Sequence, residues 1–186
     1  MSRETKDNSC ISCLDGLKPY QIRSCEGFGV LNAKYMIVGI SAGKLGALKT
    51  NVPFTKDGSG RLMQRTLNAL GLAETDEFSL KPVLKDVWLT NFVKGRILDE
   101  KGNNRLPNSE ELDYWSADFR DEYHRVQPKN LIAVGSLVRD WLTWIGFVDI
   151  KMVKHPRWYF SHGGIKQGSK ASNQMIQDYK EVLQIA

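Results

Sequence analysis

The sequence predicts an α/β protein of three layers (α/β/α), in which a central four-stranded parallel sheet lies between two layers of helices. Short apolar runs without polar alternation are typical of strands that are buried on both faces. Segments with helical spacing of apolar residues follow most of these runs, so strands and helices alternate along the chain. The length of 186 residues fits one domain over 1–186, and no internal repeat or linker divides it.

The first strand is expected at 34–40 (KYMIVGI), where the apolar run reaches a glycine and an isoleucine. An irregular segment rich in Gly, Ser, Thr and Lys follows over 41–59, which predicts either a functional loop or disorder. Apolar residues at helical spacing predict a helix from Gly60, and Gly71 is suited to end it. The second strand is expected at 86–91 (DVWLTN).

The second half of the chain repeats this alternation. After a loop rich in Gly, Asn and Pro, Asn108 or Ser109 is expected to cap a helix that ends at Pro128. A third strand is predicted at 130–134 (NLIAV). The last three predicted elements are a helix over 137–145, a strand over 148–153 and an amphipathic helix over 172–185.

Ligands of parallel α/β sheets bind beyond the carboxyl ends of the strands. Four segments follow the predicted strands at that edge, namely Gly39 to Lys44, Asn91 to Arg96, Gly135 with Ser136, and His155 to Trp158. We therefore expect the functional site at that edge of the sheet.

Composition and charge set broad bounds on function. With 41% hydrophobic and 25% charged residues, the composition is that of an ordinary globular protein. The net charge of +5 and the isoelectric point of about 9.1 are compatible with nucleic acid, but are also common in proteins that never bind it. No apolar stretch approaches a membrane span, and the polar start lacks the apolar core of a signal peptide. We expect a cytoplasmic monomer without membrane contact.

The three cysteines leave two interpretations open. An odd number of cysteines in a cytosolic protein argues against a disulfide framework. Cys10 and Cys13 have the spacing of half a metal site, and Cys25 would be a third thiolate, with His124 or His162 completing a structural zinc site. The alternative is that these thiols bind no metal.

The turn after the first strand does not match known phosphate loops. A Walker loop requires G-x-x-x-x-G-K-[S/T], but only three residues separate Gly39 from Gly43, and Leu45 follows Lys44. The G-x-G-x-x-G dinucleotide motif is absent from this turn as well. The small residues of the turn instead allow main-chain amides to approach a flat ligand closely.

Three side chains near the strand ends suggest a pocket for a nucleic-acid base. Phe54 offers a ring on which a base can stack. The amide of Asn91 supplies both a donor and an acceptor for the edge of a pyrimidine. His155 can donate to a carbonyl oxygen on which negative charge develops. The structural alternatives are a core role for Phe54, a cap or turn role for Asn91, and a structural role for His155.

Seven motifs occur in a characteristic order over nearly the whole chain. They are CISC (10–13), GISAG (39–43), NVPFTKDGSG (51–60), VWLTNFVKGR (87–96), NNRLPNSEEL (103–112), PKNLIAVGS (128–136) and HPR (155–157). Their order and spacing resemble the uracil-DNA glycosylase superfamily, nearest its iron–sulfur thermostable branch. Each motif is weak alone, and the resemblance rests on the series.

The resemblance implies a monofunctional DNA glycosylase that flips uracil or a modified pyrimidine out of DNA. Hydrolysis of the N-glycosidic bond would leave an abasic site, in base-excision repair or in defence against phage with modified DNA. The chemistry would need no cofactor, and the partner would be DNA. The base pocket would comprise Gly39, Ile40, Ala42, Gly43, Phe54 and Asn91. The catalytic residues would be Ser41, Asn91 and His155. The DNA contacts would be Lys44, Lys94, Arg96, Arg105, Ser136, Arg157 and Trp158, the last two in the segment that wedges into DNA in relatives.

The chain departs from the pattern of the family at its water-activating position. The carboxylate of the iron–sulfur branch falls at Ile40, which cannot act as a base. Ser41 can orient a water molecule but not deprotonate it, and Asp57 or another loop carboxylate is the alternative. The loss of the carboxylate favours a second interpretation, in which the chain is a DNA-binding or base-binding module without activity. The pairing of Asn91 with His155 favours the enzyme.

Two further departures concern the cluster and the pocket. The third and fourth cluster cysteines of the family fall at Gly95 and Trp115, which argues against an iron–sulfur cluster, and Trp115 is expected to fill the vacated space. Where uracil enzymes exclude a 5-methyl group with a bulky side chain, the loop here offers the residues Gly46, Ala47 and Leu48. A pocket open at C5 would admit a modified pyrimidine.

Overall fold

The computed structural model describes residues 17–74, 77–162 and 169–185, and it is built on one sheet with the strand order β1-β3-β2-β4-β5. The four parallel strands that the sequence predicts are confirmed. They are β2 (Tyr35–Ser41), β3 (Val87–Val93), β4 (Asn130–Val134) and β5 (Lys151–Val153). The sheet has a fifth strand, β1 (Phe28–Gly29), which pairs antiparallel with β3. Two residues are too few to show a periodicity, so the sequence did not reveal it.

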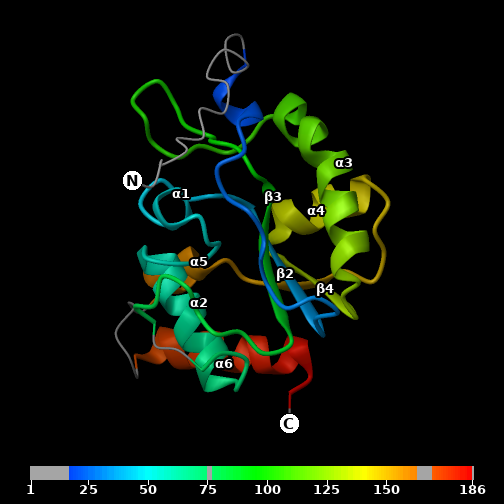
Figure 1. The fold of residues 1–186 in the computed structure, drawn as a ribbon. Helices are drawn as coiled ribbons and strands as arrows, with labels where there is room; N and C mark the ends of the chain where they lie inside the picture. The colour runs from blue at the N-terminus through cyan, green and yellow to red at the C-terminus, as the bar shows by residue number, and fades with distance from the viewer. Residues whose placement is uncertain (1–16, 75–76, 163–168, 186) are drawn as a thin grey trace, which may run out of the picture.

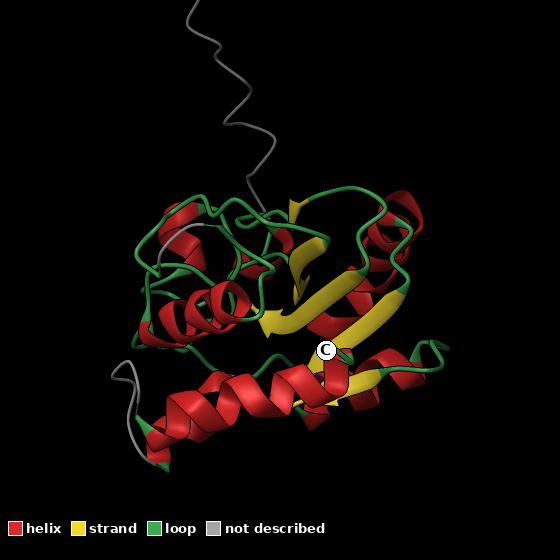
Figure 2. Cartoon of the chain, turned by 90° about the horizontal axis from the view of Figure 1, so that it is seen from below, coloured by secondary structure: helices red, strands yellow, loops and turns green. Residues whose placement is uncertain are grey.

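Helices cover both faces of the sheet, as the predicted three-layer arrangement requires (Figure 1). One face carries α2 (Gly58–Ala69), α5 (Pro156–Ser161) and α6 (Lys170–Leu183). The other carries α3 (Ser109–Val126) and α4 (Ser136–Trp144). Figure 2 shows the strands between these helices, with the C-terminus at the end of α6. Among the described residues, none of the helices combines the length and the apolar composition that a membrane span requires.

The alternation of side chains along β2 explains why a continuous apolar run forms this strand. Tyr35 and Ile37 point into the core beneath α2 and α6, whereas Met36 and Val38 point into the core beneath α3 and α4. All four side chains are buried, because both faces of the strand are covered.

Local capping signals fix several helix starts. Asp57 accepts a hydrogen bond from Gly60 N (2.8 Å) at the start of α2. Asn108 forms a capping box with Glu111 at the start of α3, as its position in the sequence predicts. The short helix α5 and a 3₁₀ turn, η2 (Pro19–Gln21), were not predicted from the sequence. Within the segment 41–59, which was predicted to be irregular, Ala47–Thr50 forms the short helix α1. The segment 41–59 is thus an ordered loop.

The register of the sheet brings two predicted site residues together. Gly39 on β2 lies opposite Asn91 on β3, near the carboxyl end of each strand. Because β4 is parallel to β2 and β5 is parallel to β4, the segments that follow them, Gly135–Ser136 and His155–Pro156, emerge at the same edge.

Candidate functional site

A cavity of about 600 Å³ opens at the carboxyl ends of the parallel strands. Many of the predicted site residues line it, from six separate stretches of the chain. They are Ile40, Ser41, Ala42, Gly43, Phe54, Asn91, Arg105, Ser136, His155 and Arg157.

Gly39 lies behind this cavity, where Phe54 and Asn91 converge on it. A Cβ atom at position 39 would lie 2.6 Å from Asn91 Oδ1 and 2.8 Å from Phe54 Cζ. The absence of a side chain therefore allows the aromatic ring and the amide to meet over β2. The two side chains expected to stack on a base and to read its edge are neighbours at one wall of the cavity.

Phe54 is held in an unusual backbone conformation. Its φ of 53° lies in the left-handed region, which residues other than glycine adopt at a cost of roughly 1–3 kcal/mol. The buried side chain of Gln64 on α2 donates to Phe54 O (2.9 Å), and a Cβ at Gly60 would lie 2.7 Å from Phe54 C. These contacts from α2 oppose the backbone strain and fix the ring at the cavity.

His155 presents a defined tautomer to the cavity. The backbone N–H of Arg157 donates to His155 Nδ1 (3.1 Å), so a neutral ring carries its proton on Nε2. Desolvation by the surrounding protein atoms lowers the pKa of His155 below its usual value, and the positive charge of Arg157 acts in the same direction, while Asp57 opposes both. The neutral ring is therefore favoured near pH 7, with Nε2–H as a hydrogen-bond donor.

Among the described residues that line the cavity, Asp57 is the one with a carboxylate side chain. Its Oδ1 is engaged by Gly60 N, while Oδ2 lies beside Gly43 and Gly46. A Cβ at Gly43 would lie 2.8 Å from Oδ2, and a Cβ at Gly46 would lie 2.4 Å from it. The two glycines thus allow the carboxylate to sit close to the β2 loop, where Ile40 and Ser41 also line the cavity.

Lys94 does not lie at the surface, so its prediction as a DNA contact is wrong. The side chain is 1% exposed and forms an ion pair with Glu122 of α3. Its Nζ also donates to Thr90 Oγ1 and to Asn91 O (2.7 Å). Glu122 in turn accepts from Trp88 Nε1 (2.9 Å). Lysine spacing in the sequence could not reveal that a carboxylate 28 positions away lies opposite the end of β3.

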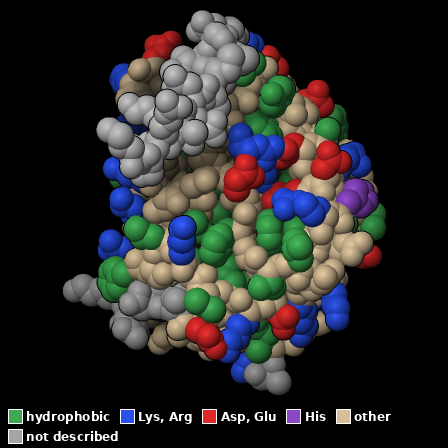
Figure 3. All heavy atoms as spheres, viewed as in Figure 1, with side chains coloured by type: hydrophobic (Ala, Val, Ile, Leu, Met, Phe, Trp, Pro, Cys, Tyr) green, Lys and Arg blue, Asp and Glu red, His purple; other side chains and the backbone are tan. Residues whose placement is uncertain are grey.

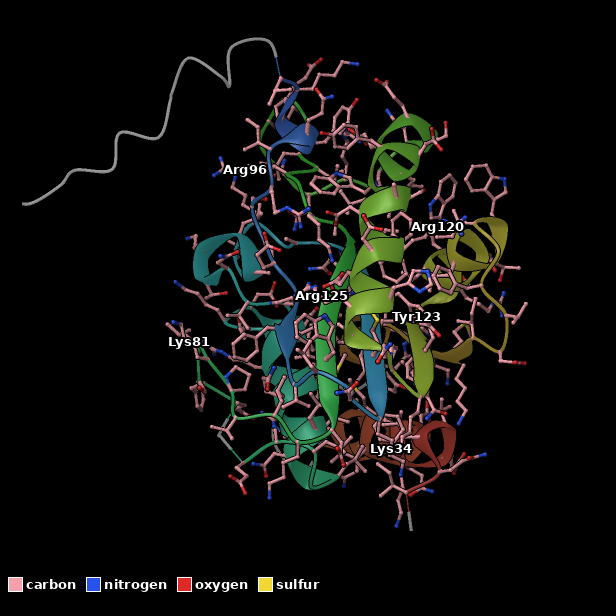
Figure 4. All side chains as sticks on the ribbon, turned by 45° about the vertical axis from the view of Figure 1, so that its right-hand side comes forward. Lys34, Lys81, Arg96, Arg120, Tyr123 and Arg125 are labelled. Carbon is pink, nitrogen blue, oxygen red and sulfur yellow. The ribbon has the colours of Figure 1, made fainter. Side chains whose placement is uncertain are left out.

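The other basic residues predicted to contact DNA lie in different surroundings. Lys44 and Arg157 are exposed near the cavity, and Figure 4 shows Arg96 projecting outward from the loop after β3. Arg105 lines the cavity, but its guanidinium forms a two-bonded ion pair with Glu111. Lys and Arg side chains follow the margin beside α1 in Figure 3, whereas basic and acidic side chains are mixed at the centre of that view.

Trp158 is not brought together with the cavity residues. Its ring stacks on His162 with centroids 4.1 Å apart, and Lys154 Nζ lies 4.1 Å from its centroid. It lines a separate, smaller cavity of about 340 Å³ together with Lys170 and Gln174. The DNA contact predicted for Trp158 therefore stays a prediction, at a place apart from the main cavity.

The zinc hypothesis receives no support from Cys25. Its thiol is buried, and burial raises its pKa to about 12, so the neutral form prevails. Cys10 and Cys13 lie outside the described residues. Within the described ranges, no three His, Cys, Asp or Glu side chains are grouped as metal ligands.

The two positions where the family places its other cluster cysteines do not fit a cluster. A Cβ at Gly95 would lie 1.8 Å from Tyr20 O, and Trp115 Nε1 donates to that same oxygen (2.8 Å). The indole is buried, as the sequence-based interpretation of Trp115 expected. The η2 turn and the indole together fill the space, so these residues do not hold an iron–sulfur cluster.

Sequence reasoning did not single out several residues that line the cavity. Asn104, Leu106 and Leu137 all face it, and Asn104 Oδ1 accepts a hydrogen bond from Lys44 N (3.0 Å). The NNRLPN motif pointed to the loop but not to the leucine within it, because an exposed leucine carries no periodic signal.

Comparisons with known proteins agree with the motif series. A model of the uracil DNA glycosylase superfamily matches residues 26–181 of the chain. The chain is also 30% identical over 121 residues to a type-5 uracil-DNA glycosylase from Pyrobaculum aerophilum. That match covers 63% of this chain and 51% of the relative, so the chain spans about half the length of the curated relative it matches.

Proposed function

The chain belongs to the uracil-DNA glycosylase superfamily, and from this premise we propose that it is a monofunctional DNA glycosylase. It takes a pyrimidine flipped out of DNA and hydrolyses the bond between the base and the sugar. The observation that carries the proposal is the convergence of Phe54 and Asn91 over Gly39, in a cavity that His155 also lines.

Binding of the base uses the wall formed by Phe54 and Asn91. The ring stacks on one face of the extruded pyrimidine, and the amide pairs with a donor and an acceptor on its edge. Both groups are fixed before DNA arrives, by the contacts of α2 with Phe54 and by the ladder of β3 with β2. Preorganised groups of this kind lose little entropy when the substrate binds.

Bond cleavage places negative charge on the base. As the bond from the base nitrogen to sugar C1′ breaks, its electron pair stays with the base, and charge develops on the base O2. The Nε2–H of neutral His155 donates to that oxygen. One donor of this kind contributes about 3 kcal/mol to the transition state. The departing base then takes a proton from solvent.

Capture of the sugar cation requires a positioned water molecule. Its oxygen bonds to C1′, and its proton passes to a nearby acceptor, which leaves an abasic site. Ile40 offers no acceptor, whereas Asp57 Oδ2 lies beside the same loop, and Ser41 adds a hydroxyl. We assign the acceptor role to Asp57 and an orienting role to Ser41. A dissociative reaction makes modest demands on this base, because the cation forms first.

The finer substrate class that we propose is a pyrimidine with a substituent at C5, as occurs in hypermodified phage DNA. Ala47 of α1 lines the cavity, in a loop where uracil enzymes carry a bulky excluding side chain. Defence against phage would then be the biological setting, and base-excision repair the setting if plain uracil is the substrate.

The alternative function is a module that binds DNA or a base without cutting it, and Ile40 is the observation that favours it. One experiment separates the two functions. Oligonucleotides carrying uracil, 5-hydroxymethylcytosine or its glucosylated form are incubated with the protein, and abasic sites are revealed by alkaline cleavage. We expect product from at least one of them, and its loss in His155→Ala and Asn91→Ala. DNA binding without product from any of these bases would leave only the module.

A further inference from the structure

We propose that the buried thiol of Cys25 fixes the orientation of the Asn91 amide, so that the pocket selects pyrimidines with a carbonyl group at C4 over those with an amino group there. This inference rests on the proposed function and names a residue that sets its specificity. Cys25 is 1% exposed, and bond cleavage itself does not use its thiol. Its role follows from its place beside the amide that reads the base.

Cys25 is held at the carboxyl end of β3, on the side away from β2. Its backbone N–H donates to Lys94 O (3.2 Å), just beyond the end of β3. The chain then runs into β1, which pairs with β3 along the edge opposite to β2. Figure 1 shows this segment descending between α1 and β3. Ala42 and Ala47 pack against Cys25, so both its backbone and its side chain are fixed.

The thiol of Cys25 accepts a hydrogen bond from the side chain of Asn91. Its one proton is directed at Glu26 O, which lies 3.6 Å from Sγ. Burial raises the pKa of Cys25 to about 12, while the charge of Lys94 and a hydrogen bond from the Asn91 side chain act in the opposite direction. A bond that lowers the pKa of a thiol is one donated to its sulfur. Because Nδ2 is the donor of an asparagine side chain, Nδ2 is the end of the amide that faces Cys25.

The other end of the amide points toward β2. Gly39 pairs with Asn91 in the sheet, and a Cβ atom at position 39 would lie 2.6 Å from Asn91 Oδ1. Rotating the amide by half a turn would place Oδ1 against a sulfur whose proton is already directed at Glu26 O. Neither atom would then receive a hydrogen bond from the other, which is costly in a buried place. The thiol therefore favours one orientation of the amide.

This orientation determines which pyrimidine edge the amide can pair with. His155 follows β5, and both β2 and β4 lie between β5 and β3. With the base O2 at His155, the ring atom N3 meets the amide atom on the β2 side, Oδ1, and the substituent at C4 meets Nδ2. Uracil-type bases carry N3–H and a C4 carbonyl, so both bonds form. Cytosine-type bases carry an N3 acceptor and a C4 amino group, so acceptor meets acceptor and donor meets donor.

The bond to Cys25 does not compete with the base. An amide nitrogen carries two N–H groups, of which one lies beside Oδ1 and the other points away from it. The first completes the paired edge with the base, and the second reaches the sulfur. Combined with the small Ala47 near C5, the inferred substrates are uracil and uracils substituted at C5. Cytosines with the same substituents are poor substrates on this inference.

The test compares single-turnover excision of uracil with that of cytosine, and of their 5-hydroxymethyl forms, at one position of a single-stranded oligonucleotide. The measured quantity is the ratio of the uracil-type rate to the cytosine-type rate. Comparing this ratio between variants cancels the intrinsic difference between the two leaving groups, and a general loss of structure lowers both rates alike. We expect wild type to release the uracil-type base at least about tenfold faster.

Three variants of Cys25 separate hydrogen bonding from packing. Cys25→Ala is smaller than the thiol and Cys25→Val is larger, and neither can accept a bond from Asn91. In both we expect the ratio to fall by about five- to tenfold, the size of one lost hydrogen bond. Cys25→Ser keeps a donor and an acceptor, so its ratio should stay within about twofold of wild type. Melting temperatures verify that each variant is folded.

The outcomes separate this inference from the proposed function. A ratio that is unchanged in Cys25→Ala and Cys25→Val, or that falls as far in Cys25→Ser, would overturn the role of the thiol while the glycosylase stands. Faster release of the cytosine-type base by wild type would overturn the orientation. If wild type releases no base, the proposed function fails. The same ratio is then taken from the dissociation constants of oligonucleotides with 2′-fluoroarabino nucleotides of uracil and cytosine, with the same outcomes for and against Cys25.

Discussion

The ammonium of Lys94 and the carboxylate of Glu122 form an ion pair that is buried directly behind Asn91. Lys94 Nζ bonds to Asn91 O as well as to Glu122, so the pair holds the end of β3 from the side away from the cavity. Burial lowers the pKa of Lys94, and the charge of Glu122 opposes that shift. Through its bond to Asn91 O, the pair fixes from within the protein the residue expected to read the base.

Breaking this pair should destabilise the protein. Lys94→Met leaves the carboxylate of Glu122 buried without its cation, and we expect a loss of about 3–5 kcal/mol in the free energy of unfolding. Urea denaturation measures this loss. The double variant with Glu122→Gln should recover part of it, since no buried charge remains. A loss below about 1 kcal/mol in the single variant would show that the pair is not buried as described.

The charge of Asp57 can be tested apart from its capping role. Asn caps helices about as well as Asp, so Asp57→Asn should leave the melting temperature nearly unchanged. We expect it to lower the excision rate by about 10²-fold, the lower end of the range for a lost general base, because the dissociative reaction makes modest demands on that base. Asp57→Ala, which also removes the cap, should in addition lose about 1 kcal/mol of stability. A full rate in Asp57→Asn would remove the carboxylate from the mechanism.

The pH dependence of excision should follow His155. Below its pKa the ring gains a proton on Nδ1, which then faces the N–H of Arg157 instead of accepting from it. The pKa of His155 lies below the usual value of about 6.5, so the rate should be constant near neutral pH and fall only under more acidic conditions. A rate that already falls between pH 8 and 7 would contradict a lowered pKa. In His155→Ala the excision rate should be lower by about 10²–10³-fold, and its decrease at acidic pH should disappear.

Gly39 should tolerate no side chain. In Gly39→Ala the new Cβ would lie 2.6 Å from Asn91 Oδ1 and 2.8 Å from Phe54 Cζ, so the ring or the amide must move. We expect excision to fall by about 10²-fold, since small misplacements of positioning groups cost rates of that size. Circular dichroism would verify that the fold persists. An unchanged rate would mean that Phe54 and Asn91 do not need their present positions.

Restoring a cluster cysteine should not restore a cluster. Gly95→Cys places a Cβ 1.8 Å from Tyr20 O, so the η2 turn must shift, and we expect a lower melting temperature without iron in the purified protein. Trp115→Phe removes the hydrogen bond to Tyr20 O together with part of a buried ring, and should cost at least about 1 kcal/mol. Iron content by elemental analysis, with absorbance near 400 nm, checks the first variant. Stoichiometric iron would show that the space can open.

The sequence by itself determined the alternation of strands and helices, the cap of α3, and the identity of Phe54, Asn91 and His155 as candidates. These features can be predicted because apolar runs, helical periodicity and capping residues are patterns of residues that are close together in the sequence. The short elements β1 and α1 were missed, since two or four residues carry no period.

Only the tertiary structure decided which way the side chains at the strand ends turn. The side chain of Lys94 points into the protein because it forms an ion pair with Glu122 of α3. The side chain of Trp158 lies away from the main cavity because its ring stacks on His162 and contacts Lys154. The position of the loop around Leu106 depends on distant partners as well. Arg105 donates to Leu106 O and to Glu111 of α3, and Asn104 accepts from Lys44 N of the loop after β2. The direction of a side chain depends on partners that folding brings from distant positions, and spacing along the chain does not encode them.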